Sequence, residues 1–290
     1  MRIAVTGASS SIGRSVCDAA LAAGLDVVRL VRTPTQSGDV FFDLSQPPQP
    51  GVLDGVSALI HIAWNWAESG LSYRKVNVDG GRRLLALCES GSTRVVLLST
   101  FSMYSKHSSM YASAKRALEE DIRSLQGSTV RAGLLWGSEM AGMTQTVTKL
   151  ARTRGVCPHL SPDPIVYQSH EATVAQVLVE ECVGMTMSRV ILGAHPRPLP
   201  LSQLVHVARG SSSGIHVGIP VTPLRTGLRF VENAGVSLRV RSDSLGGALT
   251  NADVPATHWE DAFSSRFPDN DAFIVWLQSQ SQLGIDKGRG

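Results

Sequence analysis

A tyrosine and a lysine four residues apart, Tyr111 and Lys115, are the side chains of this sequence best suited to proton transfer. On a helix, residues at this spacing project from one face, one turn apart. A phenol has a reference pKa of about 10 and transfers protons poorly at neutral pH. A neighbouring ammonium group favours the phenolate, so Lys115 is expected to lower the pKa of Tyr111. The same lysine can hold ribose hydroxyls. The alternative is that Tyr111 and Lys115 are simply neighbours on the exposed surface of a helix.

A hydroxyl group precedes this pair in the sequence. The apolar run over residues 95–98 ends in Ser99 and Thr100. Because ligands of open α/β folds bind at the carboxyl ends of the strands, both hydroxyls are expected at the ligand-binding edge. Thr100 can then hydrogen-bond a substrate carbonyl beside Tyr111.

Residues 6–14, TGASSSIGR, have the pattern of a phosphate-binding turn between a strand and a helix. Gly7 allows a sharp turn, and Gly13 lets the helix start close to a pyrophosphate that meets its N-terminus. A serine stands where a middle glycine is usual, and its hydroxyl can donate to a phosphate oxygen. An ordinary turn is the alternative. The predicted cofactor contacts of this loop are Gly7, Ser9, Ser10, Ser11, Ile12, Gly13 and Arg14.

The residues that follow the second apolar run, residues 27–31, bear on the choice of cofactor. No acidic residue is present there to receive a ribose 2′-hydroxyl, and Arg32 stands in its place. A guanidinium group can pair with a 2′-phosphate, helped by Arg14, so NADP is favoured over NAD. A solvated Arg32 is the alternative. Asp43, followed by Leu44, can receive the adenine amino group or can cap a turn.

Alternating apolar and amphipathic stretches must position these residues. Near-continuous apolar runs suit strands that are buried on both faces of a parallel sheet. Their alternation with helices predicts an α/β protein with a Rossmann-type doubly wound sheet. Gly24 is expected to end the first helix. The predicted strands are residues 2–5, 27–31, 40–44, 58–63, 95–99, 130–136 and 190–193, and the predicted helices are residues 12–23, 73–89, 110–125 and 171–182.

Glycine, proline and serine become frequent after about residue 137, which suggests a second, smaller unit. We expect a dinucleotide-binding domain over residues 1–165, to which residues 171–194 return. A smaller α+β substrate lobe would cover residues 195–290, with residues 138–165 contributing. Arginines of this lobe can grip a diphosphate or can simply be solvated. They are Arg197, Arg225, Arg229, Arg239 and Arg241.

The composition excludes several classes of protein. The 290 residues are 43% hydrophobic and 18% charged, and the net charge of +3 has no dense basic block, so neither nucleic acid nor a membrane surface is indicated. A strand that starts at residue 2 leaves no room for a signal peptide, and no apolar run reaches about 18 residues. Four scattered cysteines form no metal-like cluster, so a cytoplasmic protein without a metal site is expected.

Together these motifs resemble the extended short-chain dehydrogenase/reductase family, within its epimerase/dehydratase and nucleotide-sugar 4-keto-reductase group. The matching segments are residues 6–13, 43–44, 59–63, 77–80, 99–104, 111–115 and 130–137. The resemblance implies that Tyr111 is the general acid/base, with Lys115 and Thr100 as its partners. It also implies that Asn77 supports the proton relay and that Ala63 lies near the nicotinamide ribose. We further expect a homodimer.

Three aromatic side chains in or after the strand at residues 58–63 have open roles. His61 matches the family strand, but packing in the core is the preferred interpretation. Trp64 and Trp66 either line the cofactor or substrate site or simply pack.

These observations predict an NADP-dependent reductase of a keto group on a nucleotide-linked sugar, with Tyr111 as proton donor to the developing alkoxide. The alternatives are a nucleotide-sugar epimerase with bound NAD, a reductase of another small carbonyl compound, and a non-catalytic NADP-sensing or scaffold protein. Arg32 weighs against the epimerase. The hydroxyl, tyrosine and lysine set weighs against the non-catalytic protein.

Overall fold

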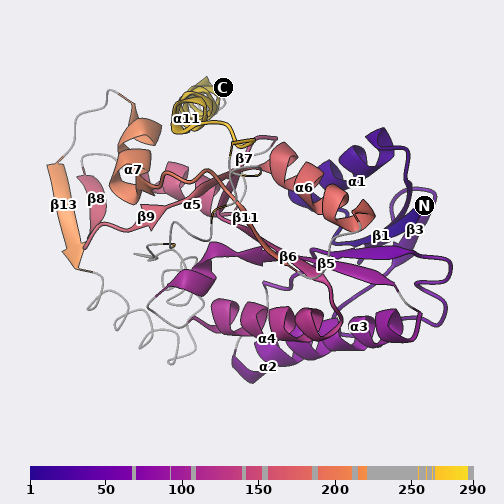
Figure 1. The fold of residues 1–290 in the computed structure, drawn as a ribbon. Helices are drawn as coiled ribbons and strands as arrows, with labels where there is room; N and C mark the ends of the chain where they lie inside the picture. Colours follow the sequence, from indigo (N-terminus) through magenta and orange to yellow (C-terminus); the bar gives the residue numbers. More distant parts are fainter. Residues whose placement is uncertain are drawn as a thin grey trace.

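The computed structural model in Figure 1 describes residues 1–66, 70–91, 93–105, 109–138, 142–151, 156–184, 189–210, 215–220, 254, 259, 263 and 265–286. Its centre is a parallel sheet of seven strands in the order β11-β6-β5-β4-β1-β2-β3. The strands are β1 (Arg2–Thr6), β2 (Asp26–Val31), β3 (Asp39–Phe41), β4 (Ala58–His61), β5 (Arg94–Thr100), β6 (Ser128–Ala132) and β11 (Val190–Gly193). The predicted Rossmann-type doubly wound sheet is confirmed.

Helices cover both faces of this sheet (Figure 1). One face packs against α1 (Ser11–Ala22) and α6 (Glu171–Val183). The other packs against α2 (Gly70–Arg74), the π-helix η1 (Lys75–Asp79), α3 (Gly80–Gly91) and α4 (Met110–Ser124).

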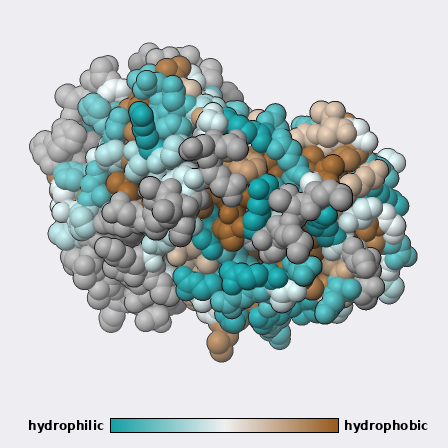
Figure 2. Space-filling view, viewed as in Figure 1, coloured by the Kyte–Doolittle hydropathy of each residue, from teal (hydrophilic) through white to brown (hydrophobic). Residues whose placement is uncertain are grey.

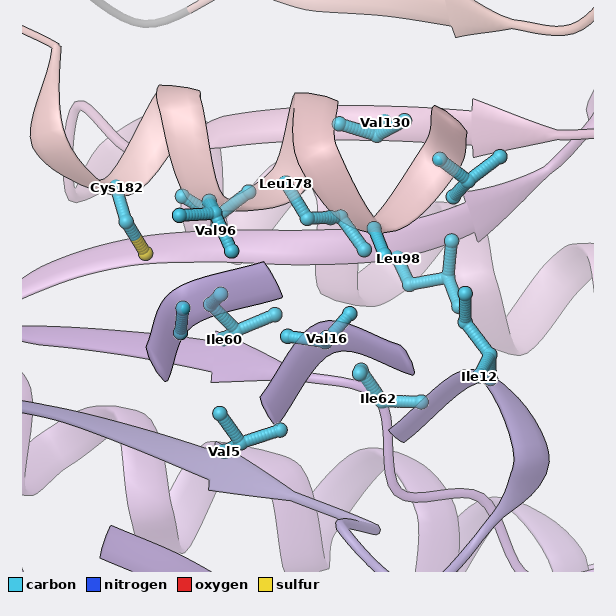
Figure 3. Close-up of a cluster of buried hydrophobic side chains, with 14 of the residues drawn as sticks. Val5, Ile12, Val16, Ile60, Ile62, Val96, Leu98, Val130, Leu178 and Cys182 are labelled. Atoms are coloured by element: carbon cyan, nitrogen blue, oxygen red, sulfur yellow. The ribbon is translucent and has the colours of Figure 1, made fainter. Parts of the chain in front are cut away.

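Successive residues of a strand supply the cores on the two faces. Val5 of β1 contributes to the core under α1 and α6, whereas Ala4 contributes to the opposite core. Figure 3 shows Val16, Ile60 and Leu178 converging in the first of these cores. Burial on both faces explains why the strands read as continuous apolar runs.

The strand order reverses beside β1, which pairs with β2 on one side and with β4 on the other. Thr6, the last residue of β1, is level with Leu30 of β2 and His61 of β4. The segments that leave β1 and β4 therefore diverge from the same point of the sheet edge. Ligands of open α/β sheets bind at such a switch point.

The later part of the chain builds a second group of elements beside the sheet, on the left in Figure 1. Helices α5 (Gly142–Ala151), α7 (Leu201–Arg209) and α11 (Asn270–Asp286) share a core that includes Trp136 and Phe273. Three strand pairs accompany them: β7 (Leu134–Trp136) with β10 (Gln168–His170), β9 (Ile165–Val166) with β12 (Leu199–Pro200), and β8 (Val156–Ser161) with β13 (Ile215–Pro220). The domain boundaries expected from the sequence stay a prediction.

The surface in Figure 2 is mostly hydrophilic, with hydrophobic residues exposed between the polar ones. Within the described part of the chain, none of the helices combines the length and the apolar character needed to cross a membrane.

Two predicted elements are each divided in the structure. The strand expected at residues 130–136 breaks at Gly133, where a Cβ atom would lie 2.0 Å from the carbonyl oxygen of Tyr167. The chain turns there, so β6 stays in the main sheet while β7 pairs with β10. The helix expected at residues 73–89 is divided into α2, η1 and α3, with the buried side chain of Asn77 in the π-helical turn.

Two predicted strands are also shorter than expected. β3 ends at Phe41, and Asp43 then caps a turn by accepting from Ser45 N at 2.8 Å. β4 ends at His61 because Ile62 N and Ala63 N both donate to the Thr6 hydroxyl instead of to a neighbouring strand.

Leu178→Ala is expected to lower the free energy of unfolding by about 3 kcal/mol, because Leu178 is fully buried between α6 and the sheet. Urea denaturation measures the change. The control is Leu21→Ala on α1, where the side chain is 59% exposed and the expected change is below about 0.5 kcal/mol. Equal losses in the two variants would contradict this account of the core.

Candidate functional site

The turn between β1 and α1 is built around two glycines. Gly7 has a φ of +69°, a left-handed conformation that favours glycine. A Cβ atom at Gly13 would lie 2.1 Å from the carbonyl oxygen of Gly7, so no larger residue fits there. Ser10 caps α1: Gly13 N donates to Ser10 Oγ at 3.1 Å, and Ser10 Oγ donates to Gly7 O at 2.8 Å. The helix therefore begins tightly against the end of β1.

This turn presents a helix N-terminus at the ligand-binding edge of the sheet. Ser9 and Ser10 are exposed there, whereas Ile12 is buried in the core. The N-terminus of α1, a helix of 12 residues, suits an anion. Both serine hydroxyls expected to reach a phosphate are engaged within the protein, Ser10 in the cap and Ser11 with a glutamate.

That glutamate, Glu171, was missed by the sequence analysis. It is buried at the start of α6, and Ser11 Oγ lies 2.9 Å from both of its carboxylate oxygens. Ser15 Oγ and Ser138 Oγ also donate to it, at 2.7 and 2.8 Å. The contacts cross up to 160 positions of sequence, so no local pattern announces them. Glu171 thus fixes α1 to α6 beside the candidate phosphate site.

The residues expected to select the cofactor lie at the end of β2. Arg32 is exposed, and Arg14 is exposed with its Nη1 donating to Ser9 O at 2.7 Å. Asp39, at the start of β3, is paired with Arg29 at 2.8 Å. The N–H of Thr35 and the Arg29 guanidinium hold the pKa of Asp39 below its usual value. Asp39 is therefore occupied in shaping this turn.

Asp43 and Leu44 follow β3. Asp43 Oδ1 accepts from both the N–H and the hydroxyl of Ser45, as the turn-capping alternative expected. Leu44 is buried, and its carbonyl oxygen accepts from Arg83 Nη2 at 2.8 Å. The carbonyl also meets α3 closely, since a Cβ atom at Gly80 would lie 2.2 Å from it.

The Thr6 hydroxyl joins the ends of β1 and β4. It accepts from Ile62 N and Ala63 N at 3.0 Å, so its own proton is directed to His61 Nδ1 at 2.9 Å. Burial, and secondarily the charge of Lys115, lower the pKa of His61 to about 3. His61 is therefore a neutral core residue, and Ala63 is held beside Gly7.

The Thr100, Tyr111 and Lys115 side chains converge at the carboxyl end of β5. Thr100 caps the 3₁₀-helix η2 (Phe101–Tyr104) and hydrogen-bonds with Tyr111. Ser109 caps α4 and so sets the first turn of the helix that carries Tyr111 and Lys115.

The electrostatics of the pair differ from the expectation. Burial raises the pKa of Tyr111 to about 12, although its hydrogen bond with Thr100 acts in the opposite direction. Burial also lowers the pKa of Lys115 to about 7, opposed by the carboxylate of Glu119. Lys115 Nζ donates to Leu98 O at 2.7 Å, deep in the sheet edge. The expected lowering of the tyrosine pKa is thus outweighed by burial.

Two tryptophans surround the tyrosine. The Trp64 ring meets Tyr111 edge-on at 5.3 Å between centroids, and Lys115 Nζ lies 4.2 Å over the Trp64 ring. The Trp66 ring lies 5.0 Å from Tyr111 at an angle of 37°. The ring of Trp64 thus packs against both members of the tyrosine and lysine pair.

Asn77 holds the segment that carries these tryptophans. Its Oδ1 accepts from Asn65 N at 2.7 Å, and its Nδ2 donates to Asn65 O at 3.0 Å and to Tyr73 O at 3.1 Å. The side chain is fully buried in the π-helix η1. The role in the proton relay expected for Asn77 stays a prediction, and its hydrogen bonds to the Asn65 backbone were not expected from the sequence.

The part of the chain expected to bind substrate is less completely described. Arg197 is exposed before β12. The other arginines expected to grip a diphosphate, Arg225, Arg229, Arg239 and Arg241, lie outside the described residues.

A doubly wound sheet with a glycine turn at its switch point, and a hydroxyl, tyrosine and lysine set at the same edge, defines the class of extended short-chain dehydrogenases and reductases. The family model described as "NAD dependent epimerase/dehydratase family" matches residues 3–159, which is more than half of the chain. The chain belongs to this family and is an NAD(P)-dependent enzyme. A comparison with curated proteins gives no match.

Solved structures with this fold include three of nucleotide-sugar proteins. The UDP-N-acetylglucosamine 4-epimerase from Methanobrevibacter ruminantium M1, in complex with UDP-N-acetylmuramic acid, has 16% identity and a TM-score of 0.68 over 99% of this chain and 98% of that chain. MoeE5 in complex with UDP-glucuronic acid and NAD has 17% identity and a TM-score of 0.62 over 86% of this chain and 97% of that chain. The Thermus thermophilus UDP-glucose 4-epimerase complex with NAD has 16% identity and a TM-score of 0.60 over 86% of this chain and 97% of that chain. At these identities the likeness shows the fold.

Lys115→Met is expected to change how stability depends on pH. The pKa of Lys115 is about 7 in the folded protein, whereas the ordinary pKa of a lysine is 10.5, so between these values the unfolded chain binds more protons. Stability from this residue therefore rises with pH in that window. Relative to Lys115→Met, the wild-type protein should gain about 2 kcal/mol between pH 6 and pH 8.5.

Urea denaturation at the two pH values measures this difference. Lys149→Met is the control, because Lys149 is exposed on α5 and should leave the pH dependence unchanged. Parallel curves for the wild-type protein and Lys115→Met would show that the buried amine has an ordinary pKa.

Proposed function

We propose that this enzyme is an NADP-dependent reductase of a keto group on a nucleotide-linked sugar. The observation that carries the proposal is the geometry at the carboxyl end of β5, where the Tyr111 phenol is hydrogen-bonded with Thr100 and Lys115 follows one turn later on α4. Such a phenol keeps its proton at neutral pH and can give it to a carbonyl oxygen.

The direction of proton transfer separates reduction from epimerisation. Reduction of a ketone needs an acid at the oxygen from the start. Epimerisation through a ketone begins by oxidising an alcohol and needs a base first. A phenol is protonated at neutral pH even at its ordinary pKa of about 10, so Tyr111 starts as the acid that reduction needs.

The residues at the sheet edge fit a nicotinamide dinucleotide. Because Gly13 lies tightly against Gly7, α1 begins at the end of β1, where its N-terminus can meet a pyrophosphate. Arg32 is exposed at the end of β2, where an acidic residue would select a free 2′-hydroxyl. We assign Arg32, with Arg14 nearby, to a 2′-phosphate, which makes NADP the preferred cofactor.

Each residue of the set then has a distinct task. When bound, the cofactor supplies the hydride that reduces the carbonyl carbon. Tyr111 donates its proton to the carbonyl oxygen, and Thr100 orients that oxygen. When it is protonated, Lys115 stabilises the negative charge that develops on the tyrosine oxygen. Asn77 fixes the segment that packs against Tyr111, so the phenol stays in place during the transfer.

Two of the similar structures are complexes with UDP-sugars. We extend this substrate class, the nucleotide-linked sugars, to this chain because the fold is shared and the chain belongs to the epimerase/dehydratase family. A homodimer and a cytoplasmic location belong to the same proposal. The free cysteines Cys17, Cys88 and Cys182 are buried, as expected in a reducing compartment.

Epimerisation with bound NAD is the second candidate. It is favoured by the names of two of the similar proteins, which are 4-epimerases, and by the NAD in two of the complexes. Tightly retained NAD in the purified protein would support this candidate, whereas exchangeable NADPH would support the reductase.

Tyr111→Phe is expected to lower kcat/KM for a nucleotide-linked 4-keto sugar by a factor of about 10²–10⁴, because the variant has no proton to give. NADPH binding should be unchanged. NADPH oxidation followed by absorbance measures the rate. Tyr167→Phe, which removes a hydroxyl from a buried core tyrosine, should retain activity. Full activity in Tyr111→Phe would exclude the tyrosine as the acid.

Arg32→Ala is expected to weaken NADPH binding by at least about tenfold and to leave NADH binding unchanged, since only NADPH carries the 2′-phosphate. Titration of cofactor fluorescence measures both affinities. Arg2→Ala removes another exposed arginine, one that pairs with Asp26, and should change neither affinity. An unchanged ratio of the two affinities in Arg32→Ala would refute the assignment.

A further inference from the structure

We propose that Trp66 is the residue against which the sugar ring of the substrate stacks while its carbonyl faces Tyr111. This inference rests on the proposed function and names a specificity-determining residue for it. The Trp66 side chain is 61% exposed, although its ring lies only 5.0 Å from the ring of Tyr111. It is an aromatic surface next to the candidate proton donor.

The position of Trp66 is fixed by its neighbours in the segment. The buried Asn77 side chain binds both the N–H and the carbonyl of Asn65, the preceding residue. Trp64, the residue before Asn65, donates from its Nε1 to Tyr73 OH at 2.8 Å, and Lys115 Nζ lies over its ring. Because the backbone of the preceding residue is held before any ligand arrives, less conformational entropy of the protein is lost when Trp66 is ordered against a ligand.

The arrangement divides the two tryptophans between two tasks. The Trp64 ring packs edge-to-face with the Tyr111 ring, and Lys115 Nζ lies over the Trp64 ring face, so this ring makes its contacts within the protein. Trp66 is tilted by 37° to the Tyr111 ring and keeps most of its surface exposed. Packing alone would be expected to bury a side chain of this size more completely.

The size and chemistry of the exposed ring fit a pyranose. A six-membered ring whose carbonyl oxygen reaches the Tyr111 hydroxyl is about as large as the phenol ring itself. Because the Trp66 ring lies beside the Tyr111 ring, we place one face of the sugar against the exposed part of the indole. The C–H face of a sugar is apolar and slightly positive, and the indole face carries the negative part of its quadrupole. Polar groups at the rim of the sugar stay free to bind elsewhere.

A neighbouring residue offers a matched contrast. Leu71 on α2 is a 92% exposed apolar side chain only five positions from Trp66. An effect of apolar exposure in general would appear at both positions, whereas stacking at the site would appear at Trp66 alone.

The test compares ligands that differ by the sugar. Calorimetry of the NADPH-loaded protein measures binding of UDP, dTDP, GDP and ADP, and of UDP-glucose, dTDP-glucose, GDP-mannose and ADP-glucose. The nucleotide pair that binds best to the wild-type protein is then used. The sugar should tighten its binding. In Trp66→Leu the affinity for the nucleotide sugar should fall about tenfold, while the affinities for the free nucleotide and for NADPH stay unchanged.

The controls separate stacking from other effects. Trp66→Phe, which keeps an aromatic ring, should retain part of the gain, and Leu71→Ala should retain all of it. Trp66→Leu with the full gain, or with equal weakening of the nucleotide and the nucleotide sugar, would overturn the role of Trp66. A loss seen for an aromatic ketone such as 1-tetralone but not for the sugar would overturn the sugar assignment. If the wild-type protein bound no nucleotide sugar, the proposed function would fail and this inference with it.

Discussion

The Thr6 hydroxyl is the contact on which the candidate site depends most. It ends β4 by accepting the N–H groups of Ile62 and Ala63, and it orients His61 with its own proton. The chain after β4 is thereby turned out of the sheet toward Trp64 and Trp66. The same contact brings Ala63 against the glycine turn, since a Cβ atom at Gly7 would lie 3.1 Å from the Ala63 backbone. One hydroxyl thus couples the candidate cofactor turn to the aromatic segment around Tyr111.

Charge inside the protein is arranged along one face of α4. Lys115 and Glu119 are both buried on this helix, one turn apart, and the Glu119 carboxylate raises the pKa of Lys115 against the stronger effect of burial. Arg131 of β6 pairs with Glu119 at 2.6 Å and donates to Tyr104 OH at 2.8 Å. Because Glu119 is already paired with Arg131, Lys115 lacks a full counterion of its own. Burial therefore has the larger effect and lowers the pKa of Lys115 to about 7, and burial, with the charge of Lys115 as a smaller cause, also keeps the nearby His61 neutral.

The sequence predicted those parts of the molecule that depend on local pattern. The strand at residues 190–193 coincides with β11, and Gly24 follows α1 with a φ of +73°. The convergence of Thr100 with Tyr111 followed from the rule that strand ends share an edge. Contacts between distant segments could not be predicted in this way. The Glu171 carboxylate meets Ser11 across 160 positions, and the break at Gly133 depends on the path of Tyr167.

The serines of the first turn illustrate how a local interpretation changes with its surroundings. Ser10 stands where a glycine is usual, and its hydroxyl caps α1, which a glycine cannot do. Ser11 is bound to Glu171, a carboxylate that lies beside the same helix N-terminus an incoming pyrophosphate would use. Two anions that share one helix end compete for the same partial positive charge. Glu171 therefore opposes the binding of an anion at this end of α1, while its hydrogen bonds with Ser11 and Ser15 hold the helix in place.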